Sequence, residues 1–99
     1  MDTIKALRIL YAEDSPDDAE MVKREIRKSF PEVIFKVVDT REAFIHALQA
    51  FQADLVLSDY SMPSFSGLEA LKISLELQPE LPVLIVTGSI NEETAVECL

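Results

Sequence analysis

The stretch of residues 54–63 constrains the fold of this chain more than any other. A short apolar run, residues 55–57, stops two residues later at an acid, Asp59, and a loop with Pro63 and Gly67 follows. Apolar runs of this length between turn signals are typical of a strand that is buried on both faces. In open α/β sheets, ligands bind beyond the carboxyl ends of the strands. We therefore predict that this strand delivers the Asp59 carboxylate to a functional edge of a sheet.

Three further apolar runs, with helical patterns between them, complete an alternation of strands and helices. We predict strands over residues 7–12, 33–38, 54–58 and 81–86, and helices over residues 16–29, 41–51, from about 67 to 78, and from about 92 onward. Either Asp14 or Ser15 can cap the first helix, and Thr40 can cap the second. Strands that alternate with helices of this length predict an α/β fold of parallel βαβ units with right-handed crossovers.

The spacing of apolar residues predicts which side of each helix is buried. We expect the third helix to point Leu68, Leu71 and Leu75 inward. The apolar positions expected to be buried in the first two helices are Ala19, Val22, Ile26 and Phe30, and then Phe44, Ala47, Leu48 and Phe51. His46 lies off the second stripe and is assigned no role.

Length and charge limit the functions that this chain can have. Its 99 residues indicate one domain over residues 1–99. A net charge of −9 argues against direct contact with nucleic acid, because no basic surface is available for the phosphates, and it suits cations and basic partners. The chain shows neither a long apolar segment nor a secretory signal, so we expect no membrane association. A single cysteine, Cys98, cannot form an internal disulfide and fits a cytoplasmic location.

Polar residues follow three of the predicted strands where each strand ends: Glu13, Asp14, Asp59 and Thr87. Because parallel strands bring their carboxyl ends to one edge of a sheet, we expect these side chains to meet there. Neighbouring carboxylates repel one another, and Mg²⁺, which takes one or two carboxylates plus water and phosphate oxygens, relieves that repulsion. A carboxylate at such a site can attack a phosphoryl group and form an aspartyl phosphate.

Each of these residues has a simpler interpretation when it is taken alone. Asp14 is as readily a helix cap as a ligand, and Thr87 alone is better explained as a capping or strand-forming residue. Their joint placement at three strand ends is what favours a metal and phosphoryl site.

Three motifs together resemble the receiver domain of two-component response regulators. They are the acidic pair after the first strand, the phosphoacceptor spacing, and a fourth strand that ends in a switch threonine: Glu13-Asp14, Asp59-x-x-Met62-Pro63-x-x-x-Gly67, and residues 82–88 with Thr87-Gly88. The resemblance covers the whole chain. It implies a flavodoxin-like, three-layer α/β/α fold with a parallel sheet in the order 2-1-3-4, to which the family adds a fifth strand and a fifth helix.

The resemblance also implies a role for each acid. Asp59 would accept a phosphoryl group from the phosphohistidine of a histidine kinase or a phosphotransfer protein, so the chain would catalyse at most its own phosphorylation and dephosphorylation. Asp14 and Asp59 would bind Mg²⁺ through their carboxylates, and Ser61 would bind it through its backbone carbonyl. Glu13 would hold a metal-bound water.

Further motif residues would surround the phosphoryl group. By the same resemblance, Thr87 would donate a hydrogen bond to it, and Gly88 would leave space and backbone freedom beside it. Met62, Pro63 and Gly67 would shape the loop that wraps it.

The chain departs from the family at its end, because Leu99 falls inside what would be the fourth helix. The resemblance therefore predicts a receiver domain that is incomplete at its C-terminus and lacks the lysine that follows the family's fifth strand. The fourth strand would then be an apolar edge, which invites pairing with another chain. We expect that the chain either forms a homodimer through the fourth strand and the fourth helix or is a fragment of a longer protein.

Two other functions stay open at this point. A receiver-shaped interaction module that is no longer phosphorylated would fit the shortened chain. A Mg²⁺-dependent phosphatase that uses Asp59 as a transient nucleophile would usually carry a second acid two residues later, and this chain has Ser61 there.

Overall fold

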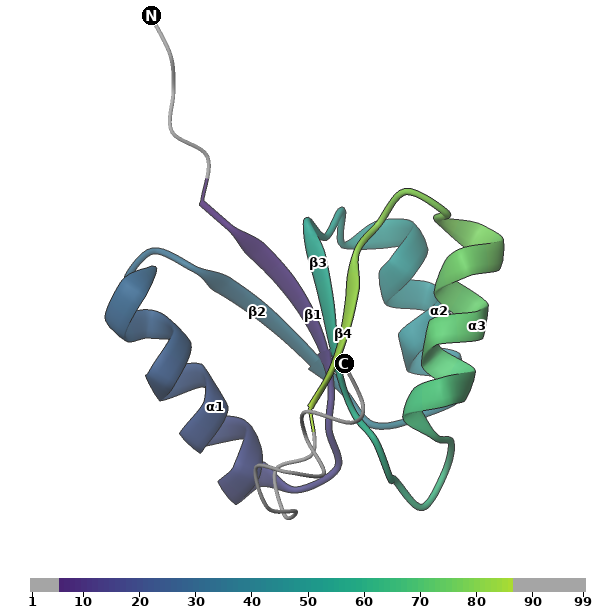
Figure 1. Ribbon diagram of the computed structural model, residues 1–99, viewed down its shortest axis with the longest axis horizontal. Helices are drawn as coiled ribbons and strands as arrows, with labels where there is room; N and C mark the ends of the chain where they lie inside the picture. The colour runs from purple at the N-terminus through teal and green to yellow at the C-terminus, as the bar shows by residue number, and fades with distance from the viewer. Residues whose placement is uncertain (1–5, 87–99) are drawn as a thin grey trace, which may run out of the picture.

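A parallel four-stranded sheet forms the centre of the computed structural model, which describes residues 6–86 (Figure 1). The strands lie in the order β2-β1-β3-β4, as predicted, and all their pairings are parallel. In this part of the chain, no helix has the length and hydrophobicity needed to cross a membrane. In chain order, the elements are β1 (Arg8–Ala12), α1 (Pro16–Ser29), β2 (Ile34–Val38), α2 (Arg41–Ala50), β3 (Leu55–Asp59), α3 (Gly67–Leu77) and β4 (Val83–Val86).

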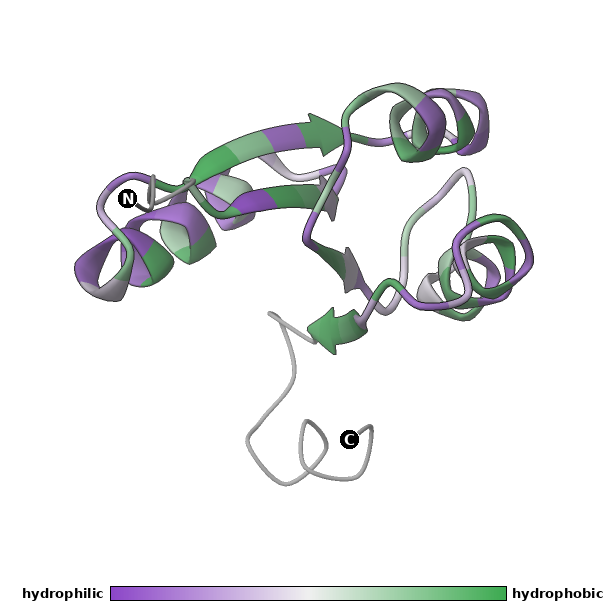
Figure 2. Ribbon diagram, turned by 90° about the horizontal axis from the view of Figure 1, so that it is seen from above, coloured by the Kyte–Doolittle hydropathy of each residue, from purple (hydrophilic) through white to green (hydrophobic). Residues whose placement is uncertain are grey.

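Helices cover both faces of the sheet, which gives three layers: α1 lies on one face, and α2 and α3 lie on the other (Figure 1). Side chains alternate along β1, so that Ile9 and Tyr11 pack toward α1 while Leu10 packs toward α2 and α3. Phe44 of α2 and Val56 of β3 are fully buried in the larger core. Figure 2 shows mainly hydrophobic strands between helices of mixed character, the arrangement expected for a sheet covered on both faces.

Polar caps fix where the three helices begin. The Ser15 hydroxyl accepts the backbone N–H of Asp18 at 3.3 Å, and Pro16 occupies the first helical turn. Thr40 caps α2 in the same way. Ser66 caps α3 in a reciprocal capping box with Glu69. Because Ser15 is the cap of α1, the Asp14 side chain is left available for other contacts.

The expected burial of α3 is wrong for two of its three leucines. Leu68 and Leu75 are 54% and 53% exposed, whereas Ala70, Ile73 and Ser74 are buried. Small residues let this face approach the sheet and α2 closely, so it is the face that packs. The sequence pattern allowed either stripe, because both have helical spacing.

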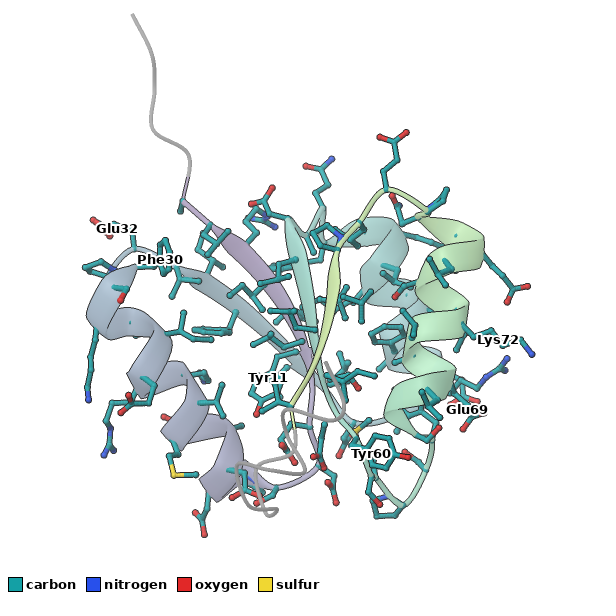
Figure 3. All side chains as sticks on the ribbon, viewed as in Figure 1. Tyr11, Phe30, Glu32, Tyr60, Glu69 and Lys72 are labelled. Atoms are coloured by element: carbon teal, nitrogen blue, oxygen red, sulfur yellow. The ribbon has the colours of Figure 1, made fainter. Side chains whose placement is uncertain are left out.

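The expected burial of Phe30 is also wrong, because its side chain is 53% exposed. It caps the C-terminus of α1 with non-helical backbone angles, so it has left the stripe that Ala19, Val22 and Ile26 continue. Figure 3 shows Phe30 at the end of α1 that lies away from the carboxyl ends of the strands.

The amino ends of the strands are held together by Arg8. Its guanidinium group lies 4.2 Å from the centroid of the Phe51 ring and donates hydrogen bonds to the backbone carbonyls of Phe51 and Gln52. Its backbone N–H donates to the Asp54 carboxylate at 2.9 Å. Gln52 adopts a positive φ of 60°, the left-handed turn that commonly ends a helix.

Candidate functional site

Adjacent strands bring three carboxylates to the carboxyl edge of the sheet. β1 and β3 are paired in register, with Ala12 opposite Ser58. Asp59 ends β3, while Glu13 and Asp14 follow β1 directly. One carboxylate oxygen from each of these three acids lies within 4.8 Å of the other two. The structure therefore gathers the three acids that the sequence placed at this edge.

Glu13 is buried and held by two donors. Its side chain is only 6% exposed. The Tyr11 hydroxyl donates to Glu13 Oε1 at 3.2 Å, and the Ser15 backbone N–H donates to Oε2 at 3.1 Å. Burial raises the pKa of Glu13, the Ser15 amide opposes that rise, and the Asp59 charge adds to it.

Asp59 is half-buried, and its environment also disfavours a negative charge. Burial raises the pKa of Asp59, the Tyr60 amide opposes this, and the charges of Asp14 and Asp18 raise it further. Glu13 and Asp59 thus both hold protons more tightly than free carboxyl groups do. A bound cation would reverse this effect, because it favours the ionised forms.

No lysine or arginine forms an ion pair with these three acids in the part of the chain that the structure describes. The ion pairs found there, Lys23–Glu20 and Lys28–Glu25, both lie along α1. A cavity of about 350 Å³ opens beside Glu13 and Asp14, between α1 and β2. The cluster is therefore an unneutralised group of hard oxygen donors next to open space, which is the chemistry that suits Mg²⁺.

The loop after Asp59 is anchored at both ends and in its middle. Met62 and Phe65 are buried in the core beneath α2 and α3, and the Phe65 ring lies 5.6 Å from that of Phe44. The Ser64 hydroxyl donates to the backbone carbonyl of Asp39, in the neighbouring loop. Ser61 and Pro63 lie between these anchors and are exposed. This places the Ser61 backbone two residues beyond Asp59, in a segment held by its neighbours.

Gly67 is required because α3 begins against the backbone of Asp59 and Tyr60. A Cβ atom at position 67 would lie 2.7 Å from the Asp59 carbonyl oxygen and 3.1 Å from the Tyr60 Cα. The Gly67 N–H donates to the Tyr60 carbonyl at 3.0 Å, which closes the loop. Gly67 thus lets the start of α3 approach the backbone of Asp59 closely, and this contact helps to set the position of Asp59.

The predicted switch residues Thr87 and Gly88 lie outside the described residues. The strand that precedes them ends beside the acidic cluster. Val86 is paired with Asp59, and its carbonyl accepts the Tyr60 N–H at 3.1 Å.

Two residues that support the site were not identified from the sequence. The Tyr11 hydroxyl was missed because its residue looks like any other apolar strand position, although it lies two residues before Glu13 and so faces the same side. Phe65 was missed because it falls in a loop, where aromatic residues carry no periodic signal. Figure 3 shows Tyr11 between the sheet and α1, near the carboxyl ends of the strands.

Comparison with known proteins gives a consistent family match. The model of the response regulator receiver domain matches residues 9–99. The chain is 33% identical over 84 residues to a protein-glutamate methylesterase/protein-glutamine glutaminase of Nitrosospira multiformis, with 84% of this chain and 23% of that protein covered. It is 31% identical over 85 residues to the regulatory protein AtoC of Escherichia coli, with 84% of this chain and 18% of that protein covered. The chain thus spans less than a quarter of the length of either relative.

A solved structure shares the fold. A response regulator from Hahella chejuensis superposes with a TM-score of 0.72 at 23% identity, over 93% of this chain and 71% of that one.

Proposed function

This chain belongs to the response regulator receiver family of two-component systems, and we propose that Asp59 is its phosphoacceptor. The phosphoryl donor would be the phosphohistidine of a histidine kinase or a phosphotransfer protein. The observation that carries the proposal is the meeting of Glu13, Asp14 and Asp59 at the end of β3, with one carboxylate oxygen of each within 4.8 Å of the others.

The donor set fits Mg²⁺. Carboxylates of Asp14 and Asp59 and the backbone carbonyl of Ser61 would hold the ion, with Glu13 reaching it through a water. These are hard oxygen donors, and Mg²⁺ is usually held by one or two carboxylates together with waters and phosphate oxygens. When bound, Mg²⁺ supplies positive charge that neutralises the oxygens of the transferring phosphoryl group.

In the transfer itself, an Asp59 oxygen attacks phosphorus as the bond between phosphorus and the donor's imidazole nitrogen breaks. The imidazole, protonated on its other nitrogen, leaves with the electron pair of that bond, and the phosphoryl group is now an acyl phosphate on Asp59. The protein's contribution is placement: Gly67 and the anchored loop hold the Asp59 backbone, so the carboxylate meets its target with little freedom to lose.

Thr87 and Gly88 complete this proposal. Because Val86 is paired with Asp59, the end of β4 lies next to the acceptor. We propose that the Thr87 hydroxyl donates to the phosphoryl group and that Gly88 leaves space beside it, with Met62 and Pro63 shaping the opposite loop.

The chain would act in the cytoplasm with protein partners and without nucleic acid or membrane contacts of its own. Its exposed edge strand suggests one more partner: Leu84 of β4 is 46% exposed. We propose that a second copy pairs at β4 and the segment that follows it, because exposed apolar edges favour such pairing. Sedimentation at increasing concentration tests this, and a monomer throughout the range would contradict it.

Incubation with Mg²⁺ and a small acyl phosphate tests the proposed function. We expect mass spectrometry to show the addition of one phosphoryl group that hydroxylamine removes. Omitting Mg²⁺ should abolish it, and so should Asp59→Asn. The matched control is Asp54→Asn, which makes the same change at the opposite end of β3 and should leave labelling intact. Absence of the adduct in the unaltered chain would favour an interaction module, and sustained phosphate release from a model ester would favour a phosphatase.

A further inference from the structure

Tyr11 places a phenol hydroxyl against the acidic cluster. The residue is 1% exposed, and its ring packs in the core beneath α1. Its hydroxyl donates to Glu13 Oε1 at 3.2 Å, and this is the hydroxyl's one hydrogen bond within residues 6–86. A buried tyrosine hydroxyl without a partner is costly, so the bond constrains both of its members.

The two donors on Glu13 fix the plane of its carboxylate. The Tyr11 hydroxyl, two residues before Glu13, donates to one oxygen, and the Ser15 N–H, two residues after it, donates to the other. A carboxylate with one donor on each oxygen cannot rotate without losing a hydrogen bond, yet it keeps lone pairs free on both oxygens. The phenol brings no charge of its own, because a tyrosine hydroxyl is neutral at neutral pH. Tyr11 can therefore orient Glu13 without competing electrostatically with a cation.

From this geometry we infer that Tyr11 is a positioning residue for the cation site: it holds the Glu13 carboxylate facing Asp14 and Asp59. The inference rests on the proposed function, in which this cluster binds Mg²⁺. Partners that orient metal-ligating side chains typically change metal affinity by one to two orders of magnitude when they are removed, and the lower value applies here because Glu13 reaches the ion through a water. Tyr11→Phe removes one oxygen atom and keeps the ring in place, so it isolates the hydrogen bond from the packing.

The first measurement is the Mg²⁺ dissociation constant by calorimetry for the unaltered chain, Tyr11→Phe and Tyr60→Phe. Tyr60 is the matched control, because it makes the same change to the chain's only other tyrosine, which is 40% exposed. We expect about tenfold weaker binding for Tyr11→Phe and no change for Tyr60→Phe. Equal affinity in all three proteins would overturn the positioning role while leaving the proposed function in place.

A double-mutant cycle separates positioning from general damage to the core. If Tyr11 acts through Glu13, Tyr11→Phe should weaken Mg²⁺ binding in the unaltered chain and have no further effect in a Glu13→Ala background, which lacks the acceptor oxygen. An equal loss in both backgrounds would mean that the hydroxyl matters only for packing, and it would overturn the inference.

A spectroscopic measurement keeps the test independent of whether Tyr11→Phe folds. The chain has no tryptophan, so Tyr11 is the only strong near-ultraviolet chromophore in Tyr60→Phe. A phenol that donates to a carboxylate changes its absorption when that carboxylate meets a cation. We expect Mg²⁺ to shift the Tyr11 band with the midpoint found by calorimetry. Binding by calorimetry with an unchanged Tyr11 band would overturn the inference alone, and no binding to any form would overturn the proposed metal site with it.

Discussion

At the amino ends of the strands, Arg8 donates to the carbonyls of Phe51 and Gln52 and lies over the Phe51 ring. At the carboxyl ends of the same strands, Glu13, Asp14 and Asp59 face one another without a basic partner in the described part of the chain. The first arrangement pairs each charge with a complementary group. The second brings like charges together, which costs stability unless a cation is bound.

This difference separates residues that stabilise the fold from residues that serve the proposed reaction. The amino ends of the strands around Arg8, called the paired end here, should tolerate loss of Mg²⁺, and mutations there should change stability alone. The end with Glu13, Asp14 and Asp59, called the carboxylate end here, should change its stability with Mg²⁺ and pH. Mutations that weaken Mg²⁺ binding there should stabilise the metal-free protein. Four predictions test this contrast.

The largest effect is expected from Gly67→Ala. The new Cβ would lie 2.7 Å from the Asp59 carbonyl oxygen, a backbone atom that can move only if the loop or α3 shifts. We expect a loss of about 3 kcal/mol in the free energy of unfolding, as for overpacked sites, together with weaker Mg²⁺ binding. Urea denaturation and calorimetry measure the two effects.

Glu76→Ala, an exposed position on the same helix, is the control for this substitution and should change neither quantity. Normal Mg²⁺ binding by a destabilised Gly67→Ala protein would show that the close approach of α3 supports the fold without setting the site.

At the amino ends, Arg8→Met should lower the free energy of unfolding by about 2 kcal/mol, because charge-assisted hydrogen bonds to two carbonyls are lost. Arg8→Lys keeps the charge but not the planar fork, so it should recover only part of the loss. Both variants should bind Mg²⁺ as the unaltered chain does. A clear change in Mg²⁺ affinity would mean that the two ends of the sheet are coupled, which would break the contrast.

The sequence allowed the acidic cluster at the carboxyl ends of the strands to be predicted, but not the contacts of Arg8 at their amino ends. The acids follow apolar runs, so parallel strands were enough to predict that Glu13, Asp14 and Asp59 meet. The role of Arg8 was hidden because its partners are backbone carbonyls more than forty residues away, and any residue offers a carbonyl.

The helix positions were also predictable, because alternating apolar patterns and capping residues are local signals, whereas the strand order was implied by the resemblance to receiver domains. The buried face of α3 was not predictable, since Leu68, Leu71 and Leu75 repeat as regularly as Ala70, Ile73 and Ser74. Packing against α2 and the sheet selected the face on which two small residues, Ala70 and Ser74, flank Ile73, and that choice depends on three elements together. The hydroxyl of Tyr11 escaped prediction for a related reason, because its partner is defined only once the strand faces are known.

A smaller effect is expected from pH in the absence of Mg²⁺. The raised pKa values of Glu13 and Asp59 mean that the folded protein binds protons more tightly than the unfolded chain. Such groups contribute full stability below their unfolded pKa, and that contribution is lost as pH rises through the folded pKa. Asp59→Asn should therefore match the unaltered chain near pH 4 and become more stable above it, by about 1 kcal/mol at neutral pH for one like-charge contact.

Asp54→Asn is the control for charge, since it removes the same charge from the paired end and should give no stabilisation at neutral pH. Adding Mg²⁺ should reverse the ranking of Asp59→Asn and the unaltered chain, since ion at 100 times its dissociation constant stabilises a binding protein by about 2.7 kcal/mol. An Asp59→Asn protein that is less stable than the unaltered chain at neutral pH without Mg²⁺ would contradict the proposed repulsion.

The smallest effect is expected from Gln52→Gly at the paired end. Among residues 6–86, Gln52 is the only non-glycine residue with a positive φ. This left-handed conformation costs an L-residue about 1–2 kcal/mol. Glycine removes that strain but adds freedom to the unfolded chain, so we expect a net gain of about 0.5 kcal/mol in the free energy of unfolding. Arg8 donates to the carbonyl of residue 52, which glycine retains, so the substitution tests backbone strain alone. Thermal unfolding with and without Mg²⁺ should show the same gain in both conditions, whereas a gain that depends on Mg²⁺ would place this turn under the influence of the carboxylate end.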